Sequence, residues 1–143
     1  MRIVVLVGLP GSGKSSYLER LGVGGLSSDR IRGLLADEER DQTIHERVFQ
    51  TVRYLLRQRL EIGRPVTYID ATNLRVEERR PYIEIGREFG CEVEAVWFDV
   101  PLEVCLRRNA GRSWVVPGAA TIEMAGRLVA PTVVEFGQMT RVE

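Results

Sequence analysis

The chain has 143 residues, of which 44% are hydrophobic and 28% charged, a composition that excludes an intrinsically disordered protein. This length predicts one domain, residues 1–143, with one hydrophobic core. The 20 basic and 20 acidic residues balance, which argues against a protein that coats nucleic acid indiscriminately. Nineteen of the basic residues are arginine, and Lys14 is the one lysine.

Strand-like and helix-like patterns alternate along the whole chain. The first half predicts strands over 2–7 and ending near 27–28, and helices over 14–21, 29–35 and 41–62. The second half predicts strands over 66–70, 91–100 and 139–142, and helices over 76–89, 101–109 and 120–129. This alternation predicts an α/β fold, in which helices cover both faces of a parallel sheet through right-handed crossovers.

The compartment is inferred from three observations. No apolar run approaches the roughly 20 residues that a membrane helix needs, and the apolar start of the chain leads directly into a Gly/Pro loop without a cleavage-type segment. The two cysteines, Cys91 and Cys105, are too few for a disulfide scaffold and lie in apolar stretches. We therefore expect a cytoplasmic protein with reduced thiols, no membrane partner and no evident obligate protein partner.

A phosphate-binding loop occupies Gly8–Ser15, where GLPGSGKS matches G-x-x-x-x-G-K-[ST] in full. The glycines let backbone N–H groups converge on phosphate oxygens, and the start of the following helix adds partial positive charge. We expect Lys14 to reach the β- and γ-phosphates of ATP and the Ser15 hydroxyl to bind Mg²⁺. The candidate nucleotide-binding residues of this loop are Gly8, Gly11, Ser12, Gly13, Lys14, Ser15 and Ser16.

A candidate acceptor site lies just after the second strand. Asp29 is a candidate general base for an attacking hydroxyl, and Arg32 lies one helical turn later on the same face. Arg32 would then hold an anionic acceptor or neutralise the transferring group. The structural alternative is a helix N-cap at Asp29 with a surface ion pair to Arg32.

Asp70 ends the strand over 66–70 and is a second acidic candidate. It resembles a Walker B acid, which would orient Mg²⁺ or brace Arg32. The alternative is a turn residue at a strand end. For Thr72 and Asn73 we expect a structural role, such as capping the next helix.

A basic segment near residue 110 predicts an arginine-bearing lid over approximately 107–118. Arg108 and Arg112 share one face if the segment is helical, so both are candidates to contact ATP and stabilise developing charge. The alternative is a basic helix C-terminus that complements the helix dipole. A different cluster, formed by Arg75, Glu77, Glu78, Arg79 and Arg80, is interpreted as a solvated helix face.

Together these motifs resemble the kinase domain of phage-type and bacterial polynucleotide 5′-kinases, a group of the P-loop kinases. The resemblance rests on Gly8–Ser15, Ser28-Asp29-x-x-Arg32, Asp70-Ala71-Thr72-Asn73, Arg108-Asn109-x-x-Arg112 and the later Val116-Pro117, Ile122-Glu123-Met124 and Leu128-x-x-Pro131. It implies a three-layer P-loop fold with about five parallel strands. It also implies that the residues matching Asp29, Arg32, Asp70, Arg108 and Arg112 serve an ATP- and Mg²⁺-dependent transfer.

Three functions are compatible with these motifs. The first is transfer of the ATP γ-phosphate to the 5′-hydroxyl of a polynucleotide. The second is a kinase of a small-molecule alcohol, because the three motifs after the P-loop recur in such kinases. The third is an ATP-binding module without transfer activity, against which the Asp29/Arg32 pair argues.

Overall fold

The computed structural model describes residues 1–111 and 117–143 of the chain. Its five strands form one parallel sheet in the order β2-β3-β1-β4-β5, with bounds β1 Arg2–Val7, β2 Leu26–Ser27, β3 Val66–Asp70, β4 Glu92–Phe98 and β5 Gln138–Val142. The helices are α1 Lys14–Leu21, α2 Ser28–Ala36, the 3₁₀-helix η1 Gln42–Ile44, α3 His45–Glu61, α4 Val76–Phe89, α5 Leu102–Ala110 and α6 Gly118–Arg127. The predicted α/β class and five-stranded parallel sheet are confirmed.

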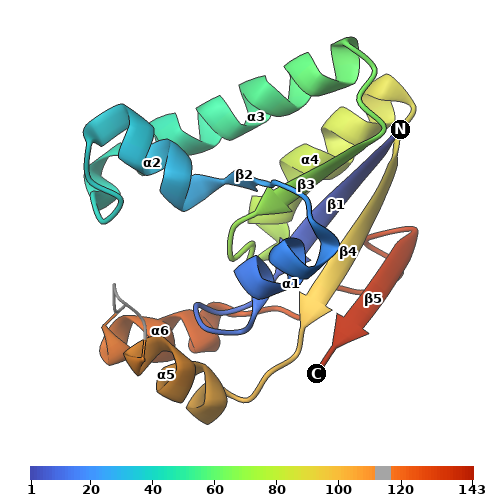
Figure 1. Ribbon diagram of the computed structural model, residues 1–143. Coiled ribbons are helices and arrows are strands. Elements are labelled where there is room, and N and C mark those ends of the chain that lie inside the picture. The colour runs from blue at the N-terminus through green and yellow to red at the C-terminus, as the bar shows by residue number, and fades with distance from the viewer. Residues whose placement is uncertain (112–116) are drawn as a thin grey trace.

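The central strand β1 separates two apolar layers. Every residue from Ile3 to Val7 is at most 1% exposed, as its continuous β-branched run predicts for a strand buried on both faces. Its odd-numbered side chains pack with α3 and α4, while Val4 and Leu6 pack with Leu18 of α1. Figure 1 shows these layers, with α1 on one side of the sheet and α3 and α4 on the other.

The predicted helix over 41–62 is divided in two. Asp41 accepts hydrogen bonds from the backbone nitrogen and the hydroxyl of Thr43, at 2.9 and 2.6 Å. These contacts cap the short η1 helix, and α3 begins only at His45. The predicted helix over 120–129 also shifts, because α6 begins at Gly118 and ends at Arg127. Beyond it, the Val129 backbone nitrogen donates to the Leu74 carbonyl at 2.8 Å instead of continuing the helix.

The carboxyl ends of the parallel strands meet at one edge of the sheet. The loop after β1, the start of α2 after β2 and the segment after β3 all emerge there. Figure 1 shows α5 and α6 lying beyond this edge, next to the loop that joins β1 to α1. A third apolar cluster attaches α5 and α6 to this edge of the sheet, because Leu9 and Leu74 pack with Cys105 of α5 and with Met124 of α6. This edge is where open parallel sheets bind ligands.

Within the described part of the chain, no helix combines the length and the apolar character that crossing a bilayer requires.

The fold predicts a strong effect at Gly86, where α4 packs against β4. A Cβ at Gly86 would lie 2.2 Å from the Val93 Cγ2 atom, whose β-branched side chain has little freedom to move. We expect Gly86→Ala to lower the free energy of unfolding by about 1–3 kcal/mol, measured by urea denaturation. The matched control is Gly126→Ala in α6, where nothing lies within 4 Å, and which we expect to be neutral or stabilising. Equal stability of the two variants would contradict the packing.

Candidate functional site

The loop between β1 and α1 is held in a conformation that depends on its glycines. Gly11 and Gly13 have φ angles of 83° and 104°, in the left-handed region that favours glycine. A Cβ at Gly11 would lie 2.5 Å from the Cys105 carbonyl oxygen, so the loop backbone packs directly against α5. Gly8 faces a similar limit, because a Cβ there would lie 2.5 Å from Ser12 Oγ.

Helix α1 begins with backbone N–H groups that no described side chain caps. Its N-cap residue is Gly13, which has no side chain to accept from the first turn. These amides and the helix dipole favour an anion at this position. Ser15 and Ser16, both predicted to contact nucleotide, are exposed in this turn. The first turn of α1 therefore has the chemistry of a phosphate site.

Lys14 is folded back across the loop. Its Nζ donates to the carbonyl oxygens of Gly8 at 2.8 Å and Leu9 at 2.9 Å. The ammonium is therefore held within the ring of loop atoms rather than extended into solvent.

Ser12 is placed differently from its neighbours. Its side chain is buried and its Oγ has no hydrogen-bond partner among the described residues. The Ser12 backbone nitrogen already donates to Leu9 O at 3.1 Å. The hydroxyl fills the space beside Gly8, so the structure gives Ser12 a packing position inside the loop.

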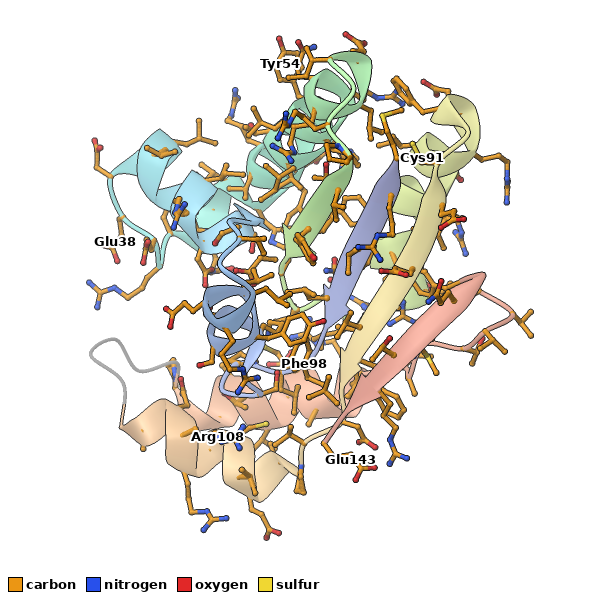
Figure 2. All side chains as sticks on the ribbon, turned by 45° about the vertical axis from the view of Figure 1, so that its right-hand side comes forward. Glu38, Tyr54, Cys91, Phe98, Arg108 and Glu143 are labelled. Atoms are coloured by element: carbon orange, nitrogen blue, oxygen red, sulfur yellow. The ribbon has the colours of Figure 1, made fainter. Side chains whose placement is uncertain are left out.

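Arg108 reaches the loop from α5. Its Nη1 lies 3.5 Å from the Ser12 carbonyl oxygen and 3.7 Å from the position that a Gly13 Cβ would take. Figure 2 shows Arg108 on the helix beside the loop. Of the predicted lid over 107–118, Arg112 lies outside the described residues. Of the predicted Arg108/Arg112 pair, the structure therefore describes only Arg108.

The thiol of Cys105 in α5 is influenced by the positive charges of Lys14 and Arg108. Burial raises the pKa of the Cys105 thiol, and the positive charges of Lys14 and Arg108 oppose that shift. The thiol is completely buried and lies 3.7 Å from the Val100 carbonyl oxygen. Cys105 is a core residue, as its apolar surroundings in the sequence predict, and its backbone shapes the loop.

The Asp29–Arg32 pair lies in the first turns of α2. Arg32 Nη1 donates to Asp29 Oδ1 at 3.0 Å, and the side chains of Arg32 and Asp29 are 5% and 57% exposed respectively. Arg32 is thus a buried cation that holds an accessible carboxylate. Its Nε has no hydrogen-bond partner among the described residues.

The two structural alternatives for this pair do not match its geometry. Ser27, not Asp29, is the N-cap of α2, because Ser27 Oγ accepts from the Arg30 backbone nitrogen at 3.2 Å. The pair is not a surface ion pair either, since Arg32 is buried. The Arg32 charge also contributes to the lowered pKa of Asp41, although hydrogen bonds from Thr43 are the main cause.

Asp70 is the last residue of β3, which lies between β2 and β1, and Asn73 follows three residues later. Asp70 is half-buried at the end of β3, in register with Ser27 of β2. Asn73 is structural, as predicted, but it caps no helix. Its Nδ2 donates to Leu6 O at 2.7 Å and Ala71 O at 3.3 Å. Asn73 therefore ties the segment after β3 to the end of β1.

The structure contradicts the expectation that Arg79 lies on a solvated helix face. Arg79 is completely buried and pairs with Glu135, which is 56 residues away. Its spacing was the available signal, because Arg79, Tyr82 and Gly86 recur on the buried face of α4 at helical intervals. The alternation of charges around Arg79 hid that signal. Among residues 1–111 and 117–143, no group of three or more His, Cys, Asp or Glu side chains is placed to hold a metal ion.

Comparisons with known proteins place the chain within a family. A family model described as an AAA domain matches residues 3–131. No curated protein sequence matched the chain.

Several solved structures share the fold. A chain in a structure of the Pnkp1/Rnl/Hen1 RNA repair complex aligns with a TM-score of 0.73 and 22% identity, covering 89% of this chain and 43% of that one. This chain thus spans less than half of that protein. A putative kinase from Chloroflexus aurantiacus J-10-fl aligns with a TM-score of 0.76 and 14% identity, covering 99% and 86%. The Mycobacterium tuberculosis APS kinase CysC, in complex with AMPPNP and APS, aligns with a TM-score of 0.63 and 21% identity, covering 98% and 87%.

At these identities the likeness establishes the fold. The phosphate-binding loop after β1, the sheet order and the helices on both faces are features that this fold carries. The family match extends over most of the chain and includes the phosphate-binding loop, Asp29, Asp70 and α5. The chain therefore belongs to this AAA-domain family, and its fold is that of the P-loop kinases.

Proposed function

We propose that this protein transfers the γ-phosphate of ATP to a hydroxyl group, with Mg²⁺ as the metal. The observation that carries the proposal is the Asp29–Arg32 pair, a buried guanidinium bonded to an exposed carboxylate. The pair comes directly after β2, which lies two strands from β1 and so about 10 Å from it at the usual strand spacing. This separation suits an acceptor hydroxyl next to a phosphate that is held by the loop after β1.

The loop over Gly8–Ser15 is the proposed ATP site. Its glycine conformations and the first amides of α1 offer N–H donors to phosphate oxygens. Lys14 would exchange its bonds to the Gly8 and Leu9 carbonyls for bonds to the β- and γ-phosphates. Arg108, which already lies beside Gly13, adds a second positive charge.

Ser15 and Asp70 are the residues that would hold Mg²⁺. A hydroxyl and a carboxylate are hard oxygen ligands, and this ion is usually bound by one or two protein groups together with substrate phosphates. Ser15 is exposed in the first turn of α1, and Asp70 is half-buried at the end of the adjacent strand β3. The bound ion would neutralise charge on the phosphates.

Asp29 is the proposed general base. The acceptor oxygen forms a bond to the γ-phosphorus while the bond from phosphorus to the β,γ-bridging oxygen breaks and ADP leaves. Asp29 takes the hydroxyl proton, and Arg32 keeps its carboxylate in place through the 3.0 Å bond. The accessibility of Asp29 allows an acceptor to reach it, and burial of Arg32 holds the pair rigid.

The 5′-hydroxyl end of a polynucleotide is the leading acceptor. The motif resemblance to polynucleotide 5′-kinases and the fold shared with a chain of an RNA repair complex support it. A small-molecule alcohol is the second candidate. It is favoured by the balanced charge of the chain and by the fold shared with an APS kinase.

The first prediction from the proposed function concerns the ATP site. Gly11→Ala brings a Cβ against the Cys105 carbonyl and adopts an unfavourable φ, so the loop must shift. Loss of one charge-assisted hydrogen bond to phosphate weakens ATP binding by about tenfold or more, which isothermal titration calorimetry measures. The matched control is Gly24→Ala, where nothing lies within 4 Å, and its dissociation constant for ATP should equal that of the wild type. Unchanged affinity in Gly11→Ala would place the nucleotide elsewhere.

The second prediction concerns the acceptor. The protein is incubated with γ-labelled ATP and Mg²⁺, and with DNA or RNA oligonucleotides that carry a 5′-hydroxyl. We expect label on these oligonucleotides, none on the same oligonucleotides with a 5′-phosphate, and none when EDTA removes Mg²⁺. Label only on members of a panel of small alcohols supports the second acceptor class instead. No transfer to any acceptor, with ATP bound, contradicts a kinase.

The third prediction concerns the general base. Asp29→Asn keeps the size of the side chain but removes its ability to take a proton, so turnover should fall about 10²- to 10⁴-fold. ATP affinity should stay within about twofold, because Asp29 does not belong to the loop. The control is Asp37→Asn at the end of the same helix, an exposed residue with a φ of 58° that asparagine tolerates. Normal turnover in Asp29→Asn would remove Asp29 from the mechanism.

A further inference from the structure

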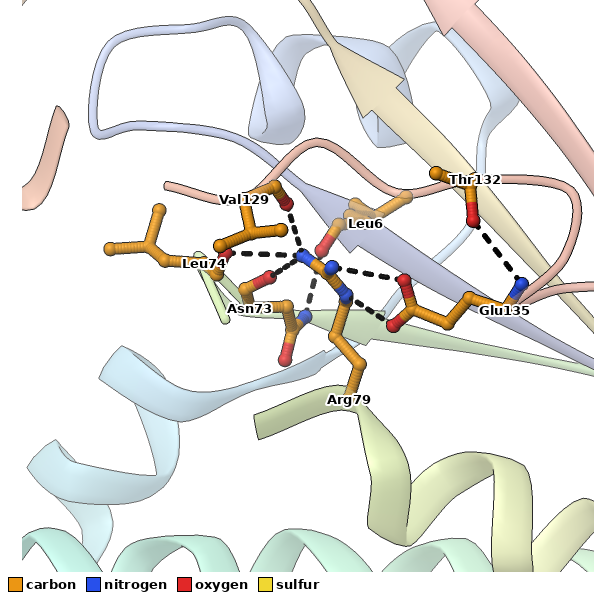
Figure 3. A network of polar contacts seen from close by, with 7 residues as sticks. All are labelled: Leu6, Asn73, Leu74, Arg79, Val129, Thr132 and Glu135. Atoms are coloured by element: carbon orange, nitrogen blue, oxygen red, sulfur yellow. Dashed lines mark hydrogen bonds and ion pairs between the residues drawn. The ribbon is translucent and has the colours of Figure 1, made fainter. Parts of the chain in front are cut away.

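Arg79 of α4 is the most completely bonded charged side chain described in this protein. It is 0% exposed, and its guanidinium donates to both carboxylate oxygens of Glu135, at 2.7 and 3.0 Å. Its Nη1 also donates to the carbonyl oxygens of Asn73 at 3.0 Å, Leu74 at 3.1 Å and Val129 at 2.8 Å. Figure 3 shows the guanidinium at the centre of these contacts.

The segments that meet at Arg79 are distant in sequence. Leu74 lies after β3, Val129 lies after α6, and Glu135 lies just before β5. Val129 is bonded on both sides, because its nitrogen donates to Leu74 O at 2.8 Å and its carbonyl accepts from Arg79. One side chain therefore joins the return of the chain from α6 to the segment after β3.

This network continues into the phosphate-binding loop. Asn73, whose carbonyl accepts from Arg79, donates through Nδ2 to Leu6 O at 2.7 Å, two residues before Gly8. The Gly8 nitrogen donates to Thr72 O at 3.0 Å, a second link between the same two segments. The chain of bonds thus runs from Val129, in the segment after α6, through Arg79 to the first residue of the loop.

Glu135 fixes the orientation of the guanidinium. Its backbone nitrogen donates to the carbonyl oxygen of Thr132 at 3.1 Å and to the Oγ1 atom of Thr132 at 3.3 Å, which forms a turn. The next residue, Phe136, is 1% exposed in the main apolar core. The turn and this anchor hold the carboxylate, whose two oxygens match the planar fork of arginine.

Stabilisation alone does not account for this arrangement. Burial of an ion pair costs desolvation energy that its attraction only partly offsets, and apolar replacements are often no less stable. A bidentate pair that also binds three carbonyls does specify geometry, because every acceptor must lie within hydrogen-bond distance of one planar guanidinium. The elements that it aligns are α6 with its neighbour α5, and the loop that Arg108 approaches.

We propose that Arg79, oriented by Glu135, is a positioning residue for the nucleotide site. It holds the return segment after α6 and the segment after β3 against the start of the phosphate-binding loop. α5 and α6, and with them Arg108, then lie in a fixed position beside the phosphates. This inference rests on the proposed function in so far as it takes the loop to bind ATP.

The chain offers a matched control on the neighbouring helix. Arg59 of α3 donates through Nε to Thr67 Oγ1 at 3.0 Å and through Nη2 to Val66 O at 2.9 Å. It is likewise a helix arginine that bonds the end of a strand. Val66 and Thr67 lie at the amino end of β3, however, away from the edge that carries the site. Loss of Arg59 therefore tests the effect of lower stability without the effect of misalignment.

The experiment compares Arg79→Met, Arg79→Lys, Glu135→Gln and Arg59→Met with the wild type. Thermal unfolding gives the stability of each variant, and ATP affinity is then measured where each is folded. We expect Arg79→Met to weaken ATP binding about 10- to 100-fold, the usual scale for misplaced binding groups. Arg79→Lys keeps the charge but loses the fork, so its affinity should fall between Arg79→Met and wild type, as should that of Glu135→Gln. Arg59→Met should bind ATP within about twofold of wild type, since it is remote from the site.

Hydrogen exchange supplies a readout that does not depend on ATP. The amides of Val129 and Gly8 donate to Leu74 and Thr72, so their exchange should accelerate in Arg79→Lys and Glu135→Gln but not in Arg59→Met. The proposal is overturned if these amides keep their wild-type rates, or if Arg79 and Arg59 variants of equal stability lose equal ATP affinity. If Arg79→Met does not fold, Arg79→Lys and Glu135→Gln decide by the same two criteria.

The outcomes separate this inference from the proposed function. A wild-type protein that binds ATP but transfers no phosphate contradicts the proposed function and leaves the affinity and exchange results as a complete test of Arg79. A wild-type protein that does not bind ATP overturns both. Normal ATP affinity in every Arg79 and Glu135 variant, with phosphate transfer intact, overturns only the positioning role.

Discussion

Burial of β1 on both faces is the constraint on which the site depends. A strand with apolar side chains in both directions needs a layer of helices on each face, and β1 has both layers and lies in the middle of the sheet, between β3 and β4. The carboxyl end of β1 therefore opens at the centre of one edge, and the segments after β2 and β3 emerge on one side of it. The phosphate-binding loop, Asp70 and the Asp29–Arg32 pair share that edge because the strands are parallel.

Arginine and lysine have different roles in this chain. Arg32 and Arg79 are buried, and each bonds a carboxylate. Arg79 bonds Glu135 through Nε and Nη2, and its remaining nitrogen, Nη1, holds carbonyls from three residues. The one lysine, Lys14, folds inside a tight ring of loop atoms, where a compact ammonium on a flexible stem fits. In a chain whose net charge is zero, Lys14 and Arg108 thus place two positive charges at the loop.

The sequence predicted most elements because their patterns are periodic and their ends carry clear signals. Gly22 and Gly90 end α1 and α4 in the left-handed conformation, and Pro101 precedes α5. Prediction failed where a side chain overrode the pattern. Asp41 caps a separate 3₁₀ turn before α3, and the role of Asn73 comes from a backbone carbonyl 67 residues away. A contact between residues as far apart as Asn73 and Leu6 leaves no local pattern in the sequence.

Sequence by itself determined the fold class, because strand and helix patterns alternate along the whole chain. It also determined the phosphate-binding loop and the candidate pairing of Asp29 with Arg32, because each depends on spacing within a few residues. Only the tertiary structure decided that Arg32 is buried while Asp29 stays accessible, and that Arg79 is buried rather than solvated. Burial depends on which segments pack together, and Glu135, which pairs with Arg79, lies 56 residues away. Helical spacing places Arg79 on the same face of α4 as Tyr82 and Gly86, but the carboxylate that compensates its charge lies on a segment that only the fold brings there.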